Sequence, residues 1–220
     1  MRARAAFSAL ALLAASCGPR LVERPAPFSR ASRHFRVVSR AAPVVIRRDL
    51  DLSQVARLPG AAGSGLRTQG LTVIRHSLAT HTNFRSEVGG TAITAWFDDV
   101  ILELSVSSTT IYIPKEYREG TCEYNAVLQH ERGHARLGRE HAAAAARELE
   151  AALASADLPT RAAPLVSVDY LAVAATLKAS LGRIIDPVYK SYEAEDIRRQ
   201  ALLDEPDPYL SVYQACKGWR

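Results

Sequence analysis

A short motif with the spacing of a metal site lies near the middle of the chain. His130 and His134 bracket Glu131 in the run His-Glu-Arg-Gly-His, an H-E-x-x-H pattern. On an α-helix, residues four apart project from one face about a turn apart, so both imidazoles can share one tetrahedral ion. Glu131 then lies beside the open coordination position, where a carboxylate can take a proton from bound water. The motif predicts a zinc site with His130 and His134 as ligands and Glu131 as the general base.

The two histidines fall on the apolar face of the expected helix, in a stripe shared with Val127 and Leu137. Two neutral imidazoles without a polar partner are unfavourable there, and a shared cation is the simplest partner. The alternative interpretation is a solvated helix face on which two His and a Glu happen to fall. Gly133 costs the helix about 1 kcal/mol relative to Ala, so we expect another backbone or the substrate to approach closely there.

A catalytic zinc needs a third protein ligand besides water. His141 lies on the same helix face as His134 but ~10 Å further along the axis, so it could bind only if the chain turned between them. The other candidates form an acidic cluster in a later helix, at Glu193, Glu195 and Asp196. We expect Glu193 to be the third ligand and His141 to be the runner-up. A surface salt bridge to neighbouring basic residues is the competing role for Glu193.

The elements that must position these residues are strands followed by helices. Apolar alternation predicts strands at 71–74, 91–97, 100–106 and 109–113, with a turn at Ser107–Ser108. Thr121 is the expected N-cap of a helix over 122–154, and further helices are expected over 168–181 and 187–203. This order predicts an α+β domain in which three helices pack on one face of a small, mainly antiparallel sheet.

The segment around the motif resembles a family of exported bacterial proteins. The run from Ile111 to the motif includes Cys122-Glu-Tyr124 and is similar to the C-x-Y-x(5)-H-E-x-x-H pattern of predicted secreted zinc-dependent proteases. The resemblance covers about 70–155 and implies a zincin-like fold and peptidase activity. In that family a Tyr-Asp and a Thr-x-His-Gly follow near the C-terminus. Here Glu193 occupies the acid position and the later His is missing.

The N-terminus predicts export. A cationic start, Met1-Arg-Ala-Arg4, precedes an apolar run of 12 residues, so residues 1–16 are expected to be a signal peptide. Small residues before Cys17 resemble a lipobox, which predicts a lipidated Cys17 at the mature N-terminus; cleavage to a soluble form is the alternative. Cys122 and Cys216 then remain as an even pair in an oxidising compartment. They are expected to form a disulfide, with two unrelated buried thiols as the alternative.

The 220-residue chain has a formal net charge of +5, and residues 17–68 hold ten Arg against three acids. We expect 17–68 to be a basic, mostly extended tether near an anionic membrane, with a short edge strand at Val44–Ile46, and 69–220 to be the metal-binding domain. Nucleic acid is not an expected partner, because no aromatic residues interleave the Arg run to stack bases. No run of about 20 apolar residues exists, which excludes a polytopic membrane protein.

The leading functional expectation is therefore a zinc metalloprotease of the bacterial periplasm, held at the membrane by a lipid anchor and acting on a peptide or protein. Candidate donors to the oxyanion are Tyr112, Tyr117, Tyr124 and His81. Strand 109–113, if it is a sheet edge, could align an extended substrate. The alternative is a non-catalytic envelope protein that binds or scaffolds and uses the same fold.

Overall fold

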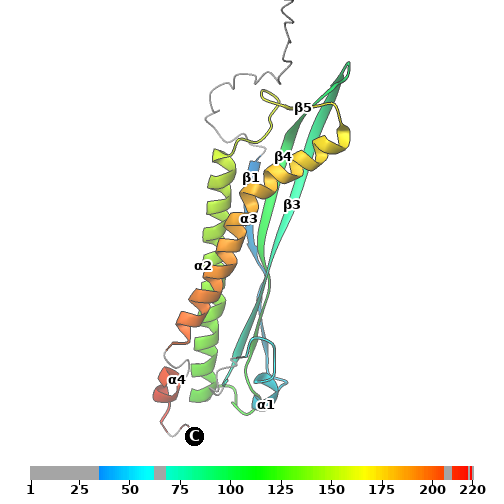
Figure 1. Cartoon of the computed structure of the whole chain (residues 1–220). Coiled ribbons are helices and arrows are strands. Elements are labelled where there is room, and N and C mark those ends of the chain that lie inside the picture. The colour runs from blue at the N-terminus through cyan, green and yellow to red at the C-terminus, as the bar shows by residue number, and fades with distance from the viewer. Residues whose placement is uncertain (1–34, 62–67, 206–209, 218, 220) are drawn as a thin grey trace, which may run out of the picture.

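A long β-hairpin forms the centre of the sheet (Figure 1). β3 (Leu71–Gly89) and β4 (Ala92–Tyr112) pair antiparallel along their length, with Gly89 opposite Ala92. Gly90 has a φ of 63° in the connecting turn, a conformation that glycine adopts without steric cost. The computed structural model describes residues 35–61, 68–205, 210–217 and 219, so the predicted signal peptide and Cys17 lie outside the described residues.

The predicted turn at Ser107–Ser108 is wrong, because β4 continues through it. Arg75 pairs with Ser108 and His76 pairs with Val106, so Ser107 is skipped in the ladder. The Ser107 hydroxyl donates to the carbonyl of Arg75 across the irregularity, at 3.0 Å. Two small polar residues here mark a β-bulge rather than a chain reversal, and the three strands expected between 91 and 113 form one strand.

Two N-terminal strands extend the sheet on the other side of β4. β1 (Phe35–Ala41) and β2 (Val44–Arg47) run parallel to β4, and β5 (Leu165–Ser167) pairs antiparallel with its beginning. The sheet is therefore mixed, which corrects the expected mainly antiparallel one. β4 is paired on both sides at 109–112, so it is not an edge.

The folded unit begins at or before Phe35 and not at residue 69, so the predicted tether is wrong for residues 35–61. These residues form β1, β2 and the short helix α1 (Leu52–Val55), and the strand expected at Val44–Ile46 is confirmed. The many arginines of this region led to the tether prediction, although its apolar residues alternate as they do in a strand. Phe35 and Val37 pack against the core, while Arg40 pairs with Glu103 at the surface.

Two long helices carry the C-terminal half. α2 (Cys122–Ser155) begins where expected, and the Thr121 hydroxyl accepts from the Tyr124 amide. α3 (Tyr170–Leu203) is one helix where two were expected, with Pro187 inside it and a visible bend in Figure 1. A short helix, α4 (Leu210–Ala215), follows. Within the described part of the chain, no helix is both long and apolar enough to cross a bilayer.

The main core lies between the helices and one face of β4. Leu102 and Leu104 of β4 are fully buried against Leu149 of α2 and Leu177 of α3, whereas Glu103 remains partly exposed. This alternation is the signature of a strand with one covered face. The helices thus lie on the covered face, and the packing of α3 against α2 determines which of their side chains meet.

Candidate metal centre

Two glycines of α2 allow α3 and β3 to approach closely. A Cβ at Gly133 would lie 3.3 Å from Leu203 Cδ2, and one at Gly138 would lie 2.7 Å from Ile74 Cδ1 and 3.5 Å from Gln200 Nε2. The close neighbour at Gly133 is therefore a side chain of α3, and not the backbone or substrate that the sequence suggested. This approach brings the end of α3 against the H-E-x-x-H motif.

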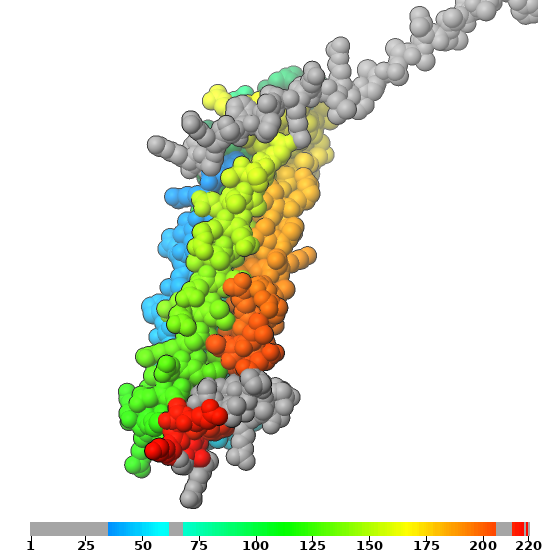
Figure 2. Space-filling model, turned by 90° about the vertical axis from the view of Figure 1, so that its left-hand side faces the viewer, coloured from blue at the N-terminus to red at the C-terminus, as the bar shows by residue number. Residues whose placement is uncertain are grey.

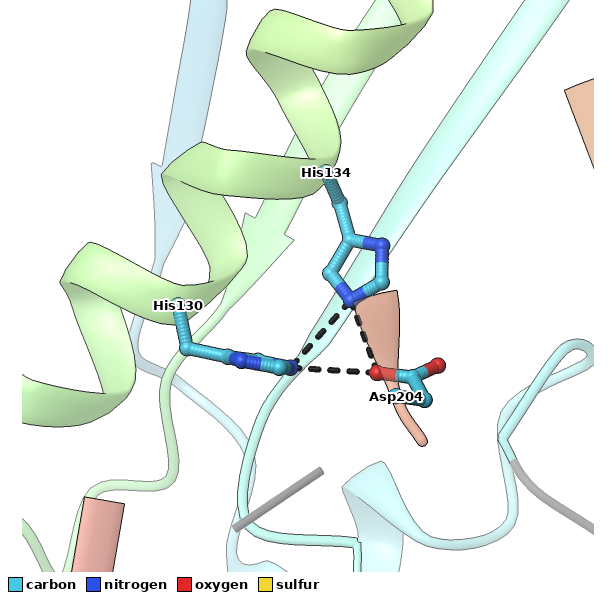
Figure 3. Close-up of side chains that lie close together, drawn as sticks. All are labelled: His130, His134 and Asp204. Carbon is cyan, nitrogen blue, oxygen red and sulfur yellow. Dashed lines mark hydrogen bonds and ion pairs between the residues drawn. The ribbon is translucent and has the colours of Figure 1, made fainter. Parts of the chain in front are cut away.

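Three side chains converge at this contact (Figure 3). His130 Nε2 and His134 Nε2 lie 3.2 Å apart, and Asp204 Oδ1 lies 3.1 Å from the first and 3.0 Å from the second. A tetrahedral ion with bonds of about 2.0–2.1 Å holds its ligands about 3.3–3.4 Å apart, so outward shifts of a few tenths of an ångström would admit it. The donor set and its spacing therefore fit a metal ion. Among the residues that the structure describes, His130, His134 and Asp204 form the one group of three His, Cys, Asp or Glu side chains whose ligand atoms lie this close together.

Asp204 meets the two histidines, whereas Glu193 and His141 do not. Glu193 is exposed on α3 beside Tyr189, and His141 is buried with its Nδ1 3.3 Å from an oxygen of Asp196. Asp204 is the C-cap of α3, directly after the residue at which the sequence predicted that helix to end. Asp204 could have been proposed from the sequence as an acid at the end of a predicted helix. Only the packing of α3 on α2 shows that it reaches the motif.

The contacts within the cluster shift the pKa values of Asp204 and His134 in opposite directions. Burial alone would raise the pKa of Asp204, but hydrogen bonds from His130 and His134 hold this pKa well below its ordinary value. Burial alone would lower the pKa of His134, but bonds to Asp204 and Gln200 outweigh it and raise the pKa. An imidazolium beside a carboxylate satisfies both groups, and a bound cation would replace the proton between them.

Gln200 orients His134. Its Oε1 lies 2.8 Å from His134 Nδ1, and its Nε2 donates to the His134 carbonyl at 3.4 Å. Because the amide nitrogen faces the carbonyl, the amide oxygen faces Nδ1, which must then carry a proton. The other ring nitrogen, Nε2, is thereby directed toward the cluster, as in metal sites whose histidines donate to an outer partner.

Glu131 faces β3 and is 2% exposed. The Thr72 hydroxyl donates to Glu131 Oε2 at 2.7 Å and lies 2.9 Å from the Glu131 carbonyl oxygen. A Cβ at Gly70 would come within 2.8 Å of the other carboxylate oxygen. The charge of Glu131 also contributes to the raised pKa of His134. In this structure it links α2 to β3.

A second polar cluster lies along the same helix pair, and His76 in it was not anticipated. Asp196 stands between two imidazoles, with His76 Nε2 3.2 Å from one oxygen and His141 Nδ1 3.3 Å from the other. The Tyr192 hydroxyl lies 2.6 Å from His76 Nδ1. All four side chains are largely buried, so β3, α2 and α3 are joined by one network.

The candidate oxyanion donors have other neighbours. Tyr117 donates to Gln69, and burial, with smaller effects from nearby groups such as Tyr213, raises its pKa to about 12. The Tyr112 and Tyr124 rings lie beneath arginines, 5.6 Å and 5.0 Å from the guanidinium carbons. His81 is exposed on β3. The three tyrosines thus have partners outside the triangle of His130, His134 and Asp204.

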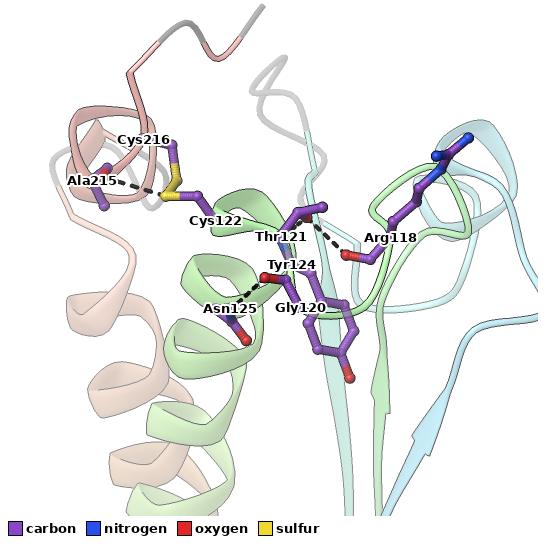
Figure 4. Close-up of a disulfide and its surroundings, with 8 residues drawn as sticks. All are labelled: Arg118, Gly120, Thr121, Cys122, Tyr124, Asn125, Ala215 and Cys216. Atoms are coloured by element: carbon purple, nitrogen blue, oxygen red, sulfur yellow. Dashed lines mark hydrogen bonds between the residues drawn. A yellow bond between two sulfur atoms is a disulfide. The ribbon is translucent and has the colours of Figure 1, made fainter.

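The expected Cys122–Cys216 disulfide is confirmed (Figure 4). The two Cα atoms are 5.8 Å apart and the residues are 94 positions apart in the chain. The bridge fastens the residue after α4 to the first residue of α2. The chain that follows Asp204 is therefore anchored near the same end of α2 that carries the motif.

Comparison with known proteins finds no family model, no curated protein and no solved structure that matches this chain. The functional assignment therefore depends on the residues and geometry described above.

Proposed function

We propose that this chain is a zinc-dependent hydrolase of the bacterial envelope that cleaves peptide bonds. The observation that carries the proposal is the triangle formed by His130, His134 and Asp204. Two imidazoles and one carboxylate, with a coordination position left for water, are a typical donor set of catalytic zinc. The Asp204 side chain is 45% exposed, which leaves the cluster open to solvent on that side.

The residues around the triangle suit a hydrolytic role. When bound, zinc would lower the pKa of a water molecule and polarise the carbonyl of the substrate. Glu131 would accept the proton of that water and return it to the leaving amine, with Thr72 holding its carboxylate between the two transfers. Gln200 would keep His134 in the tautomer whose Nε2 faces the metal.

The substrate class and location belong to the same proposal. The zincin-like resemblance around the motif supports a peptide or protein substrate. The Cys122–Cys216 bridge supports an oxidising compartment, in line with a signal peptide at 1–16 and a lipid anchor on Cys17.

A second candidate function is a non-catalytic envelope protein with a structural metal or none. The burial of Glu131 favours it, since a carboxylate that is 2% exposed and held by Thr72 behaves as a structural link. The two candidates differ in whether this carboxylate can reach a water on the metal side.

The test compares wild type with Glu131→Gln on a library of fluorogenic peptides. We expect metal-stripped wild type to gain hydrolysis on addition of Zn²⁺. The variant should bind Zn²⁺ equally but lose about 10²-fold in rate, because only the base is removed. Zinc binding without hydrolysis by wild type would support the non-catalytic candidate, and full activity of the variant would exclude Glu131 as the base.

A further inference from the structure

A groove of about 480 Å³ lies on the side of α2 that faces away from α3. Val44 and Ile46 of β2 and Ala135 of α2 form its apolar part. Figure 2 shows α2 between the N-terminal strands on one side and α3 on the other. At about 100° per residue, Arg132 on the groove side is about 200° around the helix from His130. The groove is therefore separate from the candidate metal centre.

The polar part of the groove is strongly basic. Arg132, Arg136 and Arg139 line it, with Glu140 as the acidic residue among the lining side chains. Arg136 and Glu140 are 3.9 Å apart and 77% and 67% exposed, so their ion pair neutralises little charge. The Nε of Arg139 is buried and has no hydrogen-bond partner among the described residues. These features favour an anionic occupant with oxygen acceptors.

β2 offers the groove an open sheet edge. It pairs with β4 on one side, and no strand in the described ranges pairs with its other side. Ile46 is a large apolar side chain that is 38% exposed at this edge. An unpaired edge of this kind is a template for adding an extended segment through main-chain hydrogen bonds.

The spacing of two of the arginines matches the repeat of such a strand. Arg132 and Arg136 are four residues apart on α2, which is about 6 Å along the axis. Side chains on one face of a strand recur about every 6.6–6.8 Å. An acidic residue at every second position would therefore place two successive carboxylates opposite Arg132 and Arg136.

We propose that this groove binds an extended acidic segment of a partner protein, which adds to the edge of β2 and pairs two alternate carboxylates with Arg132 and Arg136. The N-terminal stretch 17–34 of this chain is a poor occupant, because it carries four Arg and one Glu. The head groups of an anionic membrane have no main-chain amides, so a membrane would leave the edge of β2 unpaired. The proposal does not depend on the hydrolase function.

The test measures fluorescence anisotropy of a labelled peptide of alternating Glu and Val, added to the full chain at low salt. We expect saturable binding that weakens at least about tenfold in Arg136→Glu, because an opposed charge becomes a like charge. Arg147→Glu is the matched control, since it makes the same charge change at an exposed position of α2 outside the groove. A Glu-Val peptide with N-methyl groups on a central Glu and on the Val after it should also bind at least about tenfold more weakly, because one of these two amides faces β2 in either register and can no longer donate.

Several outcomes would overturn the proposal. One is the absence of binding, and another is an equal loss in Arg136→Glu and Arg147→Glu, which would indicate only diffuse attraction. Undiminished binding of the N-methylated peptide would exclude strand addition. Binding of phosphatidylglycerol vesicles through Arg136, without binding of the peptide, would identify the face as a membrane contact.

Discussion

If the two histidines of α2 bind a metal ion, Asp204 is the residue that we expect to complete the site. Asp204→Asn nearly preserves shape but replaces a carboxylate ligand by a neutral amide oxygen. We expect the affinity for Zn²⁺ to fall by more than about 100-fold, since losses of about 10–100-fold follow from changes to outer partners alone. Titration of the metal-stripped protein with Zn²⁺ measures this.

Glu193→Gln is the control for that experiment. Glu193 is an acid of the same helix that lies exposed beside Tyr189, so its loss should leave the zinc affinity unchanged. A weaker affinity in Glu193→Gln than in Asp204→Asn would restore Glu193 as the third ligand.

Gln200 makes a different kind of contribution, because it touches His134 and not the ion site. Gln200→Leu removes the acceptor at His134 Nδ1 while keeping a similar volume, and we expect zinc affinity to fall about 10–100-fold. Gln200→Glu keeps an acceptor at the same atom and should retain affinity within a few-fold. Zinc titration of the two variants decides the matter: an equal loss in both would mean that Gln200 only packs against α2.

At the scale of elements, the sequence prediction is accurate where local signals determine the structure and inaccurate where tertiary packing determines it. α2 was predicted to within a residue because its N-cap, Thr121, and its helix-forming run are local signals. α3 was divided in two because Pro187 is a local signal for a break, which tertiary packing of Leu181 and Tyr192 on the core overrides.

For the candidate site, too, the sequence predicted the part that depends on local spacing and missed the part that depends on tertiary packing. The spacing of His130 and His134 is a property of one helix, whereas the partnership with Asp204 depends on how two helices dock. The parallel pairing of β1 with β4 is likewise non-local. The arginines of β1 favoured a tether in the sequence prediction, because nothing local indicates the partner strand.

The network around Asp196 joins three elements and makes their packing pH-dependent. Burial alone would raise the Asp196 pKa, but hydrogen bonds from His76 and His141 lower it. A folded-state pKa below the unfolded value of about 3.9 contributes stability that is complete above pH ~5 and disappears as pH falls through the folded pKa.

Asp196→Asn should therefore lower the free energy of unfolding by about 1–3 kcal/mol at pH 7. The difference from wild type should shrink below about pH 4, where the wild-type carboxylate becomes protonated. Urea unfolding at a series of pH values measures both effects. Glu195→Gln is the control, because this neighbouring acid bonds exposed arginines at the surface. A pH-independent difference for Asp196→Asn would argue against the ion network.

At the scale of the whole molecule, two long helices lie alongside an elongated hairpin, and α4 lies at one end of the molecule (Figure 1). Tyr213 and Trp219 of the tail pack on each other, with ring centroids 5.2 Å apart, and Trp219 also contacts Tyr117. Gln69 donates to the Tyr213 hydroxyl at 2.8 Å. The tail thus covers the smaller apolar cluster around Ile113 and Tyr124.

The disulfide fixes this tail, and its removal separates the stability of the fold from the assembly of the site. The Cys122→Ser and Cys216→Ser double variant frees a loop closed over 94 positions, so the free energy of unfolding should fall by about 2–5 kcal/mol. Zinc affinity should change by less than about tenfold, because Leu203 against Gly133 and Gln200 against His134 hold the end of α3 from the other side. Urea unfolding and zinc titration of the double variant measure the two quantities. A folded variant that no longer binds Zn²⁺ would show instead that the tail positions Asp204, and the metal centre would then depend on the redox state of its compartment.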